Sequence, residues 1–153
     1  MIKINEPGVG QLLMDHVHGN FREGVDQVIS THSGSGELMG GVVYEHYWGN
    51  SIAMHSVGLT PRWCSRDMMW MMFHYPFRQI GCGKVIATVR SDNLRALSID
   101  FRAGFKLEAT IKDAVAPGVH LMVLTMSVAE CRWLKLSPQQ YLPGGIGIGV
   151  SNG

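Results

Sequence analysis

Charged residues are scarce in this 153-residue chain. Asp, Glu, Lys and Arg make up 16% of it, and basic side chains exceed acidic ones by one. Such a balance excludes a partner bound mainly through net charge, such as nucleic acid or an acidic membrane surface. Apolar residues make up 46% of the chain, which excludes a disordered protein. With so few charged residues, part of the surface is expected to be apolar and to be buried by a partner subunit or a bulky ligand.

Cysteines and long apolar runs are also lacking. The three cysteines, Cys64, Cys82 and Cys131, are scattered and form no C-x-x-C pair. We therefore expect no disulfide framework, and we interpret each thiol as a small buried hydrophobe. No apolar run approaches the roughly 20 residues that cross a bilayer, and no secretory signal pattern opens the chain. These absences predict a soluble protein of a reducing, cytoplasmic compartment.

The length suits one domain whose core needs neither metal nor disulfide. The composition changes at Ser137, after which Pro and Gly dominate. We expect a single domain over residues 1–136 and a Pro/Gly-rich tail over 137–153. The tail is predicted to be mobile or packed on a neighbouring subunit, and the second case would make the protein a homodimer.

Short β-branched segments bounded by turn residues predict the strands. The expected strands cover 27–31, 38–47, 51–59, 84–90, 105–111 and 119–126. The first three follow one another through tight turns and predict an antiparallel meander. Helical turns are expected over 11–17 and 129–134. Together with two longer helices, these elements predict an α+β domain with a mixed, mostly antiparallel central sheet flanked by helices.

The two longer helices have different patterns. The run MMWMMF over 68–73 has no polar face, so this helix should be buried nearly all round, bent at Pro76 and ended by Gly81. The segment 93–104 is amphipathic and stops at Gly104. Its expected core residues are Ala96, Leu97, Ile99 and Phe101.

One motif goes beyond fold class. Asn93-Leu-Arg-Ala96, followed by Gly104-Phe105, comes directly after the clearest predicted strand. This arrangement resembles the strand–Asn–helix–Gly-Phe signature of the GNAT superfamily of acyl-CoA-dependent N-acetyltransferases. The stretches GVVYEHYWGNSI, RWCSRDMMWMMFHYPFRQIG and MSVAECRWL further resemble bacteriophage-encoded members, so that the resemblance spans roughly residues 25–135.

The resemblance implies a GNAT-like acyl-CoA N-acyltransferase fold and acetyl-CoA as the donor. It also implies direct attack on the acetyl group by a primary amine of a protein or small molecule. For a viral chain the compartment would be the host cytoplasm. In the superfamily, the pyrophosphate of coenzyme A lies on backbone amides where a strand turns into a buried helix. The cofactor-binding residues implied at that turn are Arg62, Trp63, Cys64, Ser65 and Arg66.

This turn departs from the family pattern. The usual Gln/Arg-x-x-Gly-x-Gly/Ala loop has glycines, and none stands here. Ser65 is the expected helix cap, and the two arginines are expected to pair with phosphates. The alternative is an ordinary strand-to-helix loop with two solvated arginines.

The resemblance also assigns backbone donors on the preceding strand. The amides of Val57, Gly58 and Leu59 would face the thioester carbonyl, where such donors typically contribute about 2.7–4 kcal/mol to the barrier. Asn93 would order the cofactor arm or the strand–helix turn. The alternative role of Asn93 is a helix cap.

Direct attack requires a neutral amine. A lysine amine with a pKa of about 10.4 costs about 4.6 kcal/mol to deprotonate at pH 7, and an α-amino group only about 1 kcal/mol. His55 is the leading candidate base, because imidazoles titrate in this range and many relatives carry a catalytic Glu on this strand. Glu45 is the second catalytic candidate and could, with His46, relay a proton through water. The alternatives are a histidine bonded within the sheet and a solvated turn.

Two features remain open. Many superfamily members use a Tyr seven residues after the Asn to protonate the leaving thiolate; Asp100 stands there, and we assign it no catalytic role. His16 and His18 form an H-x-H, but no cysteine or carboxylate cluster supports them, so no metal site is expected. The missing glycines and Tyr leave a second interpretation open, a weak or inactive GNAT-fold module that binds coenzyme A or a host protein.

Overall fold

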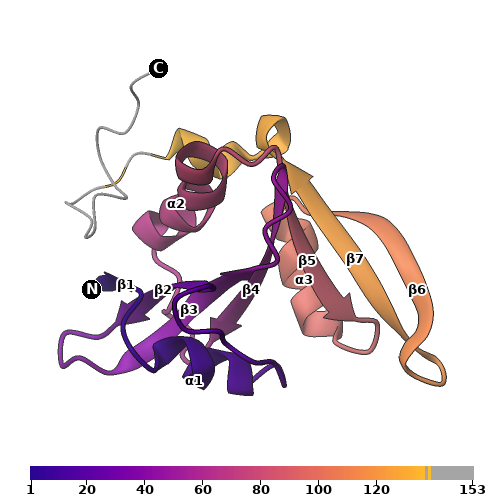
Figure 1. The fold of residues 1–153 in the computed structure, drawn as a ribbon, viewed down its shortest axis with the longest axis horizontal. Helices are drawn as coiled ribbons and strands as arrows, with labels where there is room; N and C mark the ends of the chain where they lie inside the picture. The colour runs from indigo at the N-terminus through magenta and orange to yellow at the C-terminus, as the bar shows by residue number, and fades with distance from the viewer. Residues whose placement is uncertain (137, 139–153) are drawn as a thin grey trace.

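The computed structural model describes residues 1–136 and 138, and the predicted tail lies outside these residues apart from position 138. One sheet of seven strands forms the centre of the molecule, in the order β1-β2-β3-β4-β5-β7-β6 (Figure 1). The strands are β1 (Ile2–Ile4), β2 (Gln27–His32), β3 (Leu38–Glu45), β4 (Ser51–Gly58), β5 (Lys84–Arg90), β6 (Lys106–Ala116) and β7 (Val119–Ser127). Among the strand pairs of the described residues, only β4–β5 is parallel. The predicted α+β class with a mostly antiparallel sheet is confirmed.

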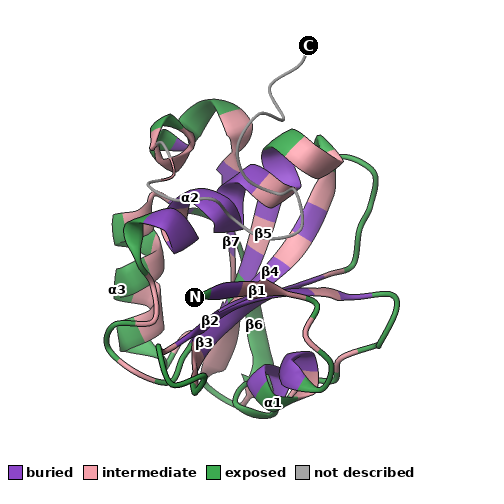
Figure 2. Ribbon diagram, turned by 90° about the vertical axis from the view of Figure 1, so that its left-hand side faces the viewer, coloured by how far each residue is buried: buried purple, intermediate pink, exposed green. Residues whose placement is uncertain are grey.

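The helices cover the two faces of the sheet unequally. They are α1 (Val9–Asp15), α2 (Arg66–His74) and α3 (Leu94–Ala103), with a π-helical extension of α2 (Tyr75–Ile80) and two 3-10 turns (Val128–Glu130 and Arg132–Lys135). Side chains alternate along β4, so Ile52 and Met54 pack with α2 while Val57 packs with Leu13 of α1. Figure 2 shows α1 across the sheet from α2. None of the helices in the described chain is long and apolar enough to cross a membrane.

The parallel strands β4 and β5 separate halfway along β4. Their pairing consists of Ser51 with Lys84, Ile52 with Val85 and Ala53 with Ile86, and no later pair follows. Figure 1 shows the two strands fanning apart beyond that point. Among the described residues, the second half of β4 therefore has a backbone edge without a neighbouring strand.

The Met-rich helix forms as its sequence predicts. Of its apolar run only Met69 is half-buried and the others are buried. Ser65 caps the helix, because its Oγ accepts a hydrogen bond from the Met68 amide at 3.1 Å. Pro76 lies in the first turn of the π-helical extension, where the disturbed hydrogen-bond ladder tolerates a residue without an N–H group. Gly81 ends the element with a φ of 86°.

Some predictions about the fold are wrong. The three-residue strand β1 was not predicted, and β6 extends to Ala116 rather than ending at Ile111. In α3, the side chains of Ile99 and Phe101 are 52% and 46% exposed, although they were expected in the core. The caps of this helix, Asn93 and Gly104, are where the sequence predicts them.

Candidate active site

The two predicted catalytic side chains lie together on the α1 face of the sheet. Register pairs Val43 with His55 and Glu45 with Ala53, so Glu45 and His55 are diagonal neighbours on adjacent strands. The Nε2 atom of His55 lies 2.7 Å from Oε1 of Glu45. Their side chains are 19% and 13% exposed. We call this pair the dyad; it lies where β4 leaves β5.

The contact determines which imidazole nitrogen is available. A carboxylate only accepts hydrogen bonds, so Nε2 of His55 donates to Glu45. In the neutral imidazole, Nδ1 then keeps the lone pair that accepts a proton. Glu45 therefore fixes the tautomer of His55.

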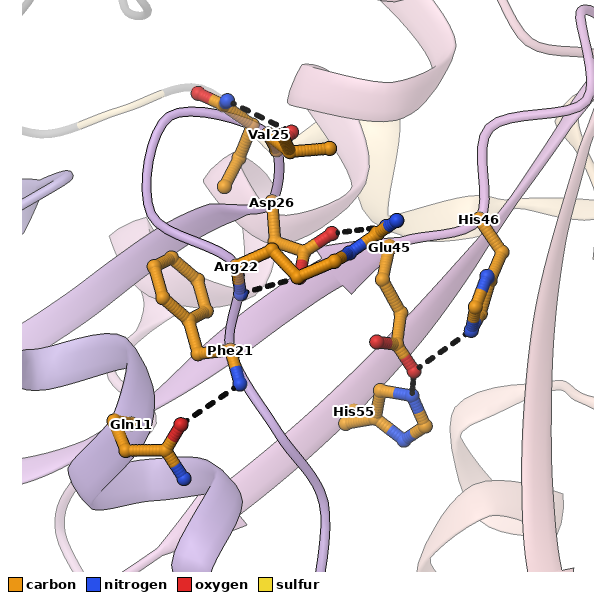
Figure 3. Close-up of polar contacts among 9 residues, drawn as sticks. Gln11, Phe21, Arg22, Val25, Asp26, Glu45, His46 and His55 are labelled. Atoms are coloured by element: carbon orange, nitrogen blue, oxygen red, sulfur yellow. Dashed lines mark hydrogen bonds and ion pairs between the residues drawn. The ribbon is translucent and has the colours of Figure 1, made fainter.

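A second imidazole approaches the same carboxylate oxygen. His46 Nε2 lies 3.5 Å from Glu45 Oε1, with the His46 side chain 57% exposed (Figure 3). The backbone of His46 is in the left-handed region, with a φ of 52°. Glu45 thus lies between one half-buried imidazole and one exposed imidazole.

Arg22 approaches the dyad from the loop after α1, and no sequence motif pointed to it. Asp26, which is 3% exposed, holds its guanidinium at 2.6 Å. The Asp26 hydrogen bond and charge raise the pKa of Arg22, and the charge of Glu45 adds to the effect. Figure 3 shows Arg22 between Asp26 and Glu45. Arg22 is therefore paired with Asp26 and also interacts electrostatically with Glu45.

Backbone donors line the open edge of β4, but not at all of the predicted positions. The Leu59 amide donates to the Met39 carbonyl at 2.9 Å. Because amides alternate in an antiparallel ladder, the Val57 amide also points toward β3, whereas those of Ser56 and Gly58 point to the side that β5 has left. Val57 and Leu59 were predicted as donors to the thioester, but their amides point toward β3; of the three predicted amides, that of Gly58 faces the open edge, as does that of Ser56.

The Trp63 side chain lies on the strands. A Cβ added to Gly58 would be 2.4 Å from Nε1 of Trp63, and one added to Gly40 would be 2.8 Å from Trp63 Cβ. The indole packs against the main core cluster, and the Trp63 amide donates to the Thr60 carbonyl at 3.3 Å. The turn has Trp63 where the family pattern has glycines, and the missing Cβ atoms of Gly40 and Gly58 on the strands make room for its side chain.

The rest of the turn keeps unsatisfied donors. Within residues 1–136, the amides of Cys64 and Ser65 make no hydrogen bond, and the exposed Arg62 guanidinium makes no ion pair. Arg66 is the first residue of α2. Burial raises the pKa of the Cys64 thiol to about 12, so this thiol stays neutral.

Asn93, which was predicted to order the cofactor arm or the strand–helix turn, and Asp67, which was not predicted, both lie at the starts of helices. Asn93 caps α3, with its Oδ1 accepting from the Ala96 amide at 3.2 Å. Asp67 is 6% exposed in the first turn of α2. A carboxylate there stabilises the helix through its dipole, but it also repels any anion bound at the same end.

Asp100 is a functional candidate to which sequence reasoning assigned no role. The helical period places it on the same side of α3 as Ala96, Leu97 and Ala103, which pack against the core. Its carboxyl is half-buried, makes no hydrogen bond or ion pair with another described residue, and has a pKa raised by burial to about 6. It is therefore partly protonated near neutral pH.

The two hollows described here are not lined by the dyad, and the described residues contain no cluster of metal-ligating side chains. A hollow of about 530 Å³ lies between the β2–β3 turn and residues 60–62. A smaller one of about 100 Å³ lies beside the loop that carries Asp26. His16 and His18 belong to no group of three or more metal-ligating side chains within the described residues.

Of the comparisons with known proteins, the one with solved structures identifies the architecture. No family model and no curated protein matches the sequence. Among solved structures, a mutant of the spermidine N-acetyltransferase SpeG from Vibrio cholerae is 15% identical with a TM-score of 0.60, covering 81% of this chain and 75% of its own. The same enzyme in complex with CoA and spermine is 14% identical with a TM-score of 0.60, covering 80% and 75%. The chain therefore has the GNAT fold of these acetyltransferases.

Proposed function

We propose that this protein is an N-acetyltransferase that moves an acetyl group from acetyl-CoA to a primary amine by direct attack. The observation that carries the proposal is the dyad, His55 with Glu45, at the point where β4 leaves β5. From the dyad, a series of backbone amides follows along the open edge of β4 and into the turn after it. Bound acetyl-CoA would supply an acetyl thioester that is already activated toward amines.

The residues fit such a substrate in part. The amides of Ser56 and Gly58 are available to an extended arm lying beside β4, in the place of a missing strand. Beyond them, Cys64 and Ser65 offer unsatisfied amides and Arg62 a cation, the donor types that bind phosphate oxygens. Asp67 works against the same anion. We therefore assign the diphosphate to the Arg62–Ser65 part of the turn, with Arg66 beside it.

The chemical roles follow from atom types. The amine nitrogen bonds to the acetyl carbon, the carbon–sulfur bond breaks, and the amine proton passes to Nδ1 of His55. Glu45 holds His55 in the tautomer that leaves Nδ1 free and stabilises the imidazolium. A thiolate leaves and takes a proton from Asp100, whose raised pKa keeps part of it protonated, or from water. Glu45 acts here as a positioning residue.

Two measurements test this function. Calorimetric titration with acetyl-CoA should give a dissociation constant in the micromolar range, and free thiol should appear when a primary amine is added. Spermidine, the acceptor named for the structural neighbours, belongs in the amine panel together with blocked lysine and peptides. Absence of binding at high micromolar acetyl-CoA would refute the proposal.

Asp67 favours a second candidate function, a GNAT-fold module with weak or no catalysis. A buried carboxylate at the start of α2 disfavours a bound diphosphate and lowers the affinity for the donor. Under this alternative, Asp67→Asn strengthens acetyl-CoA binding but no amine is acetylated by either protein. Turnover that His55→Ala abolishes would eliminate the alternative.

A further inference from the structure

The tip of the β3–β4 hairpin presents two aromatic side chains to solvent. Tyr47 is 57% exposed and Trp48 is 76% exposed. Exposed Tyr and Trp are typical of binding hot spots, because their rings supply large contact areas with little loss of conformational freedom. We call Tyr47 and Trp48 the aromatic tip.

The aromatic tip has firm support. The Trp48 amide donates to the Ser51 carbonyl at 2.9 Å, and the Asn50 carbonyl accepts from the amides of Gly83 and Lys84 at 3.0 and 3.1 Å. A Cβ on Gly83 would lie 2.8 Å from Oδ1 of Asn50, so the close approach requires glycine there. The hairpin is thus tied to the start of β5, and its exposed rings are not the result of a fraying loop.

The aromatic tip is close to the dyad along the two strands. Glu45 ends β3 directly before the tip, and His55 follows Ser51 by four residues, a span of about 13 Å along an extended strand. His46 fills the interval and contacts Glu45. An acceptor whose amine reaches His55 therefore needs about four further residues of extended chain to cover Trp48.

The surroundings of the dyad suit a large acceptor better than a small one. Small molecules usually bind in hollows that bury most of their surface. Neither of the hollows described above is lined by His55, Glu45 or His46, and the His46 side chain beside the dyad is 57% exposed. A polypeptide does not need enclosure, because it gains affinity from surface contacts on either side of the reacting group.

We infer that the acceptor amine belongs to a polypeptide whose flanking residues pack on Tyr47 and Trp48. This inference rests on the proposed acetyl transfer and specifies its acceptor. The tip supplies apolar area for the flanking residues, while Glu45 attracts the positive charge of an approaching lysine. A polypeptide acceptor predicts that the length of the acceptor, rather than its number of charges, determines the rate of acetyl transfer.

The test compares three acceptors with acetyl-CoA and the full chain. The first is lysine blocked at both ends, and the second is spermidine. The third is a set of nonapeptides that have blocked ends, a central lysine and randomised flanking residues. The variants are Tyr47→Ala/Trp48→Ala and, as a matched control, Ile111→Ala, whose side chain is 50% exposed on β6. Thiol release gives kcat/KM, and calorimetry gives acetyl-CoA affinity. Circular dichroism and the thermal midpoint check that each variant is folded.

We expect the peptides to exceed blocked lysine and spermidine at least tenfold in kcat/KM. The double variant should remove this gain but leave the blocked-lysine rate and acetyl-CoA affinity unchanged, and Ile111→Ala should leave all three unchanged. Peptides no better than blocked lysine, a gain that survives the double variant, or spermidine as the best acceptor would each overturn the inference. In those cases acetyl transfer itself still stands, whereas failure to bind acetyl-CoA and to acetylate any amine would refute both.

Discussion

Replacing Glu45 by glutamine removes the charge from the dyad and keeps its shape. The glutamine side chain would retain an oxygen that accepts from His55 Nε2, the atom that lies 2.7 Å from the carboxylate of Glu45. Hydrogen bonds to charged groups contribute about 1.5–3 kcal/mol and neutral ones about 0.5–1.5 kcal/mol. With both side chains less than one-fifth exposed, solvent screening is limited. Loss of the charge should therefore destabilise the imidazolium by about 1–1.5 kcal/mol, a factor of roughly 5–13 in rate.

The assay is kcat/KM by thiol release with acetyl-CoA and a blocked lysine peptide. Glu45→Gln should reduce it roughly 5- to 13-fold, with acetyl-CoA affinity unchanged. His55→Ala should reduce it by about 10²–10⁴-fold, the usual effect of removing a general base. Glu108→Gln, which removes an exposed carboxylate paired with Lys84, is the control and should have no effect. Full activity in His55→Ala, or equal losses in Glu45→Gln and Glu108→Gln, would show that the dyad does not act as the base.

Three other substitutions test separate parts of the molecule. Because burial raises the pKa of Asp100 to about 6, its ionised form is disfavoured in the folded state, and Asp100→Asn should raise the thermal midpoint at pH 8. This advantage should shrink as the pH falls through 6 and vanish below about 4; a pH-independent difference would contradict it. Gly58→Ala must displace Trp63 and should cost about 1–3 kcal/mol in urea unfolding, while Gly34→Ala, which meets no atom within 4 Å, should cost far less. Cys64→Ser should keep most of the activity and give no acyl-enzyme burst, since a thiol with a pKa of about 12 is a poor nucleophile; loss of turnover would indicate a covalent route instead.

Periodicity was sufficient to predict six of the seven strands and the buried helix. The short β-branched segments predict strands, and the unbroken apolar run over 68–73 predicts a buried helix; both form. The errors in α3 have a different cause. An apolar stripe shows which side of a helix faces inward, but Ile99 and Phe101 lie on its flanks, where nothing in the described chain covers them. The sequence pattern of the helix does not show which other segments would cover these two side chains.

The candidate site was predictable by residue type and not by contact. His55 and Glu45 were expected as separate groups, and only the strand register makes them diagonal neighbours. Register also decides which amides of β4 face the open edge: those of Ser56 and Gly58 do, whereas those of Val57 and Leu59 point toward β3. Asp100 gained significance from its burial, and Arg22 from a loop that comes more than twenty residues earlier than Glu45. Neither effect has a local sequence signal.

Amide chemical shifts of the isotopically labelled protein during titration with coenzyme A test the central claim most directly. We predict saturable shifts of the Ser56, Gly58, Cys64 and Ser65 amides at micromolar concentrations. The Leu59 amide, which donates to Met39, should move less. Shifts that cluster elsewhere, or none at millimolar coenzyme A, would contradict the claim that the open edge of β4 and its following turn hold the acyl donor.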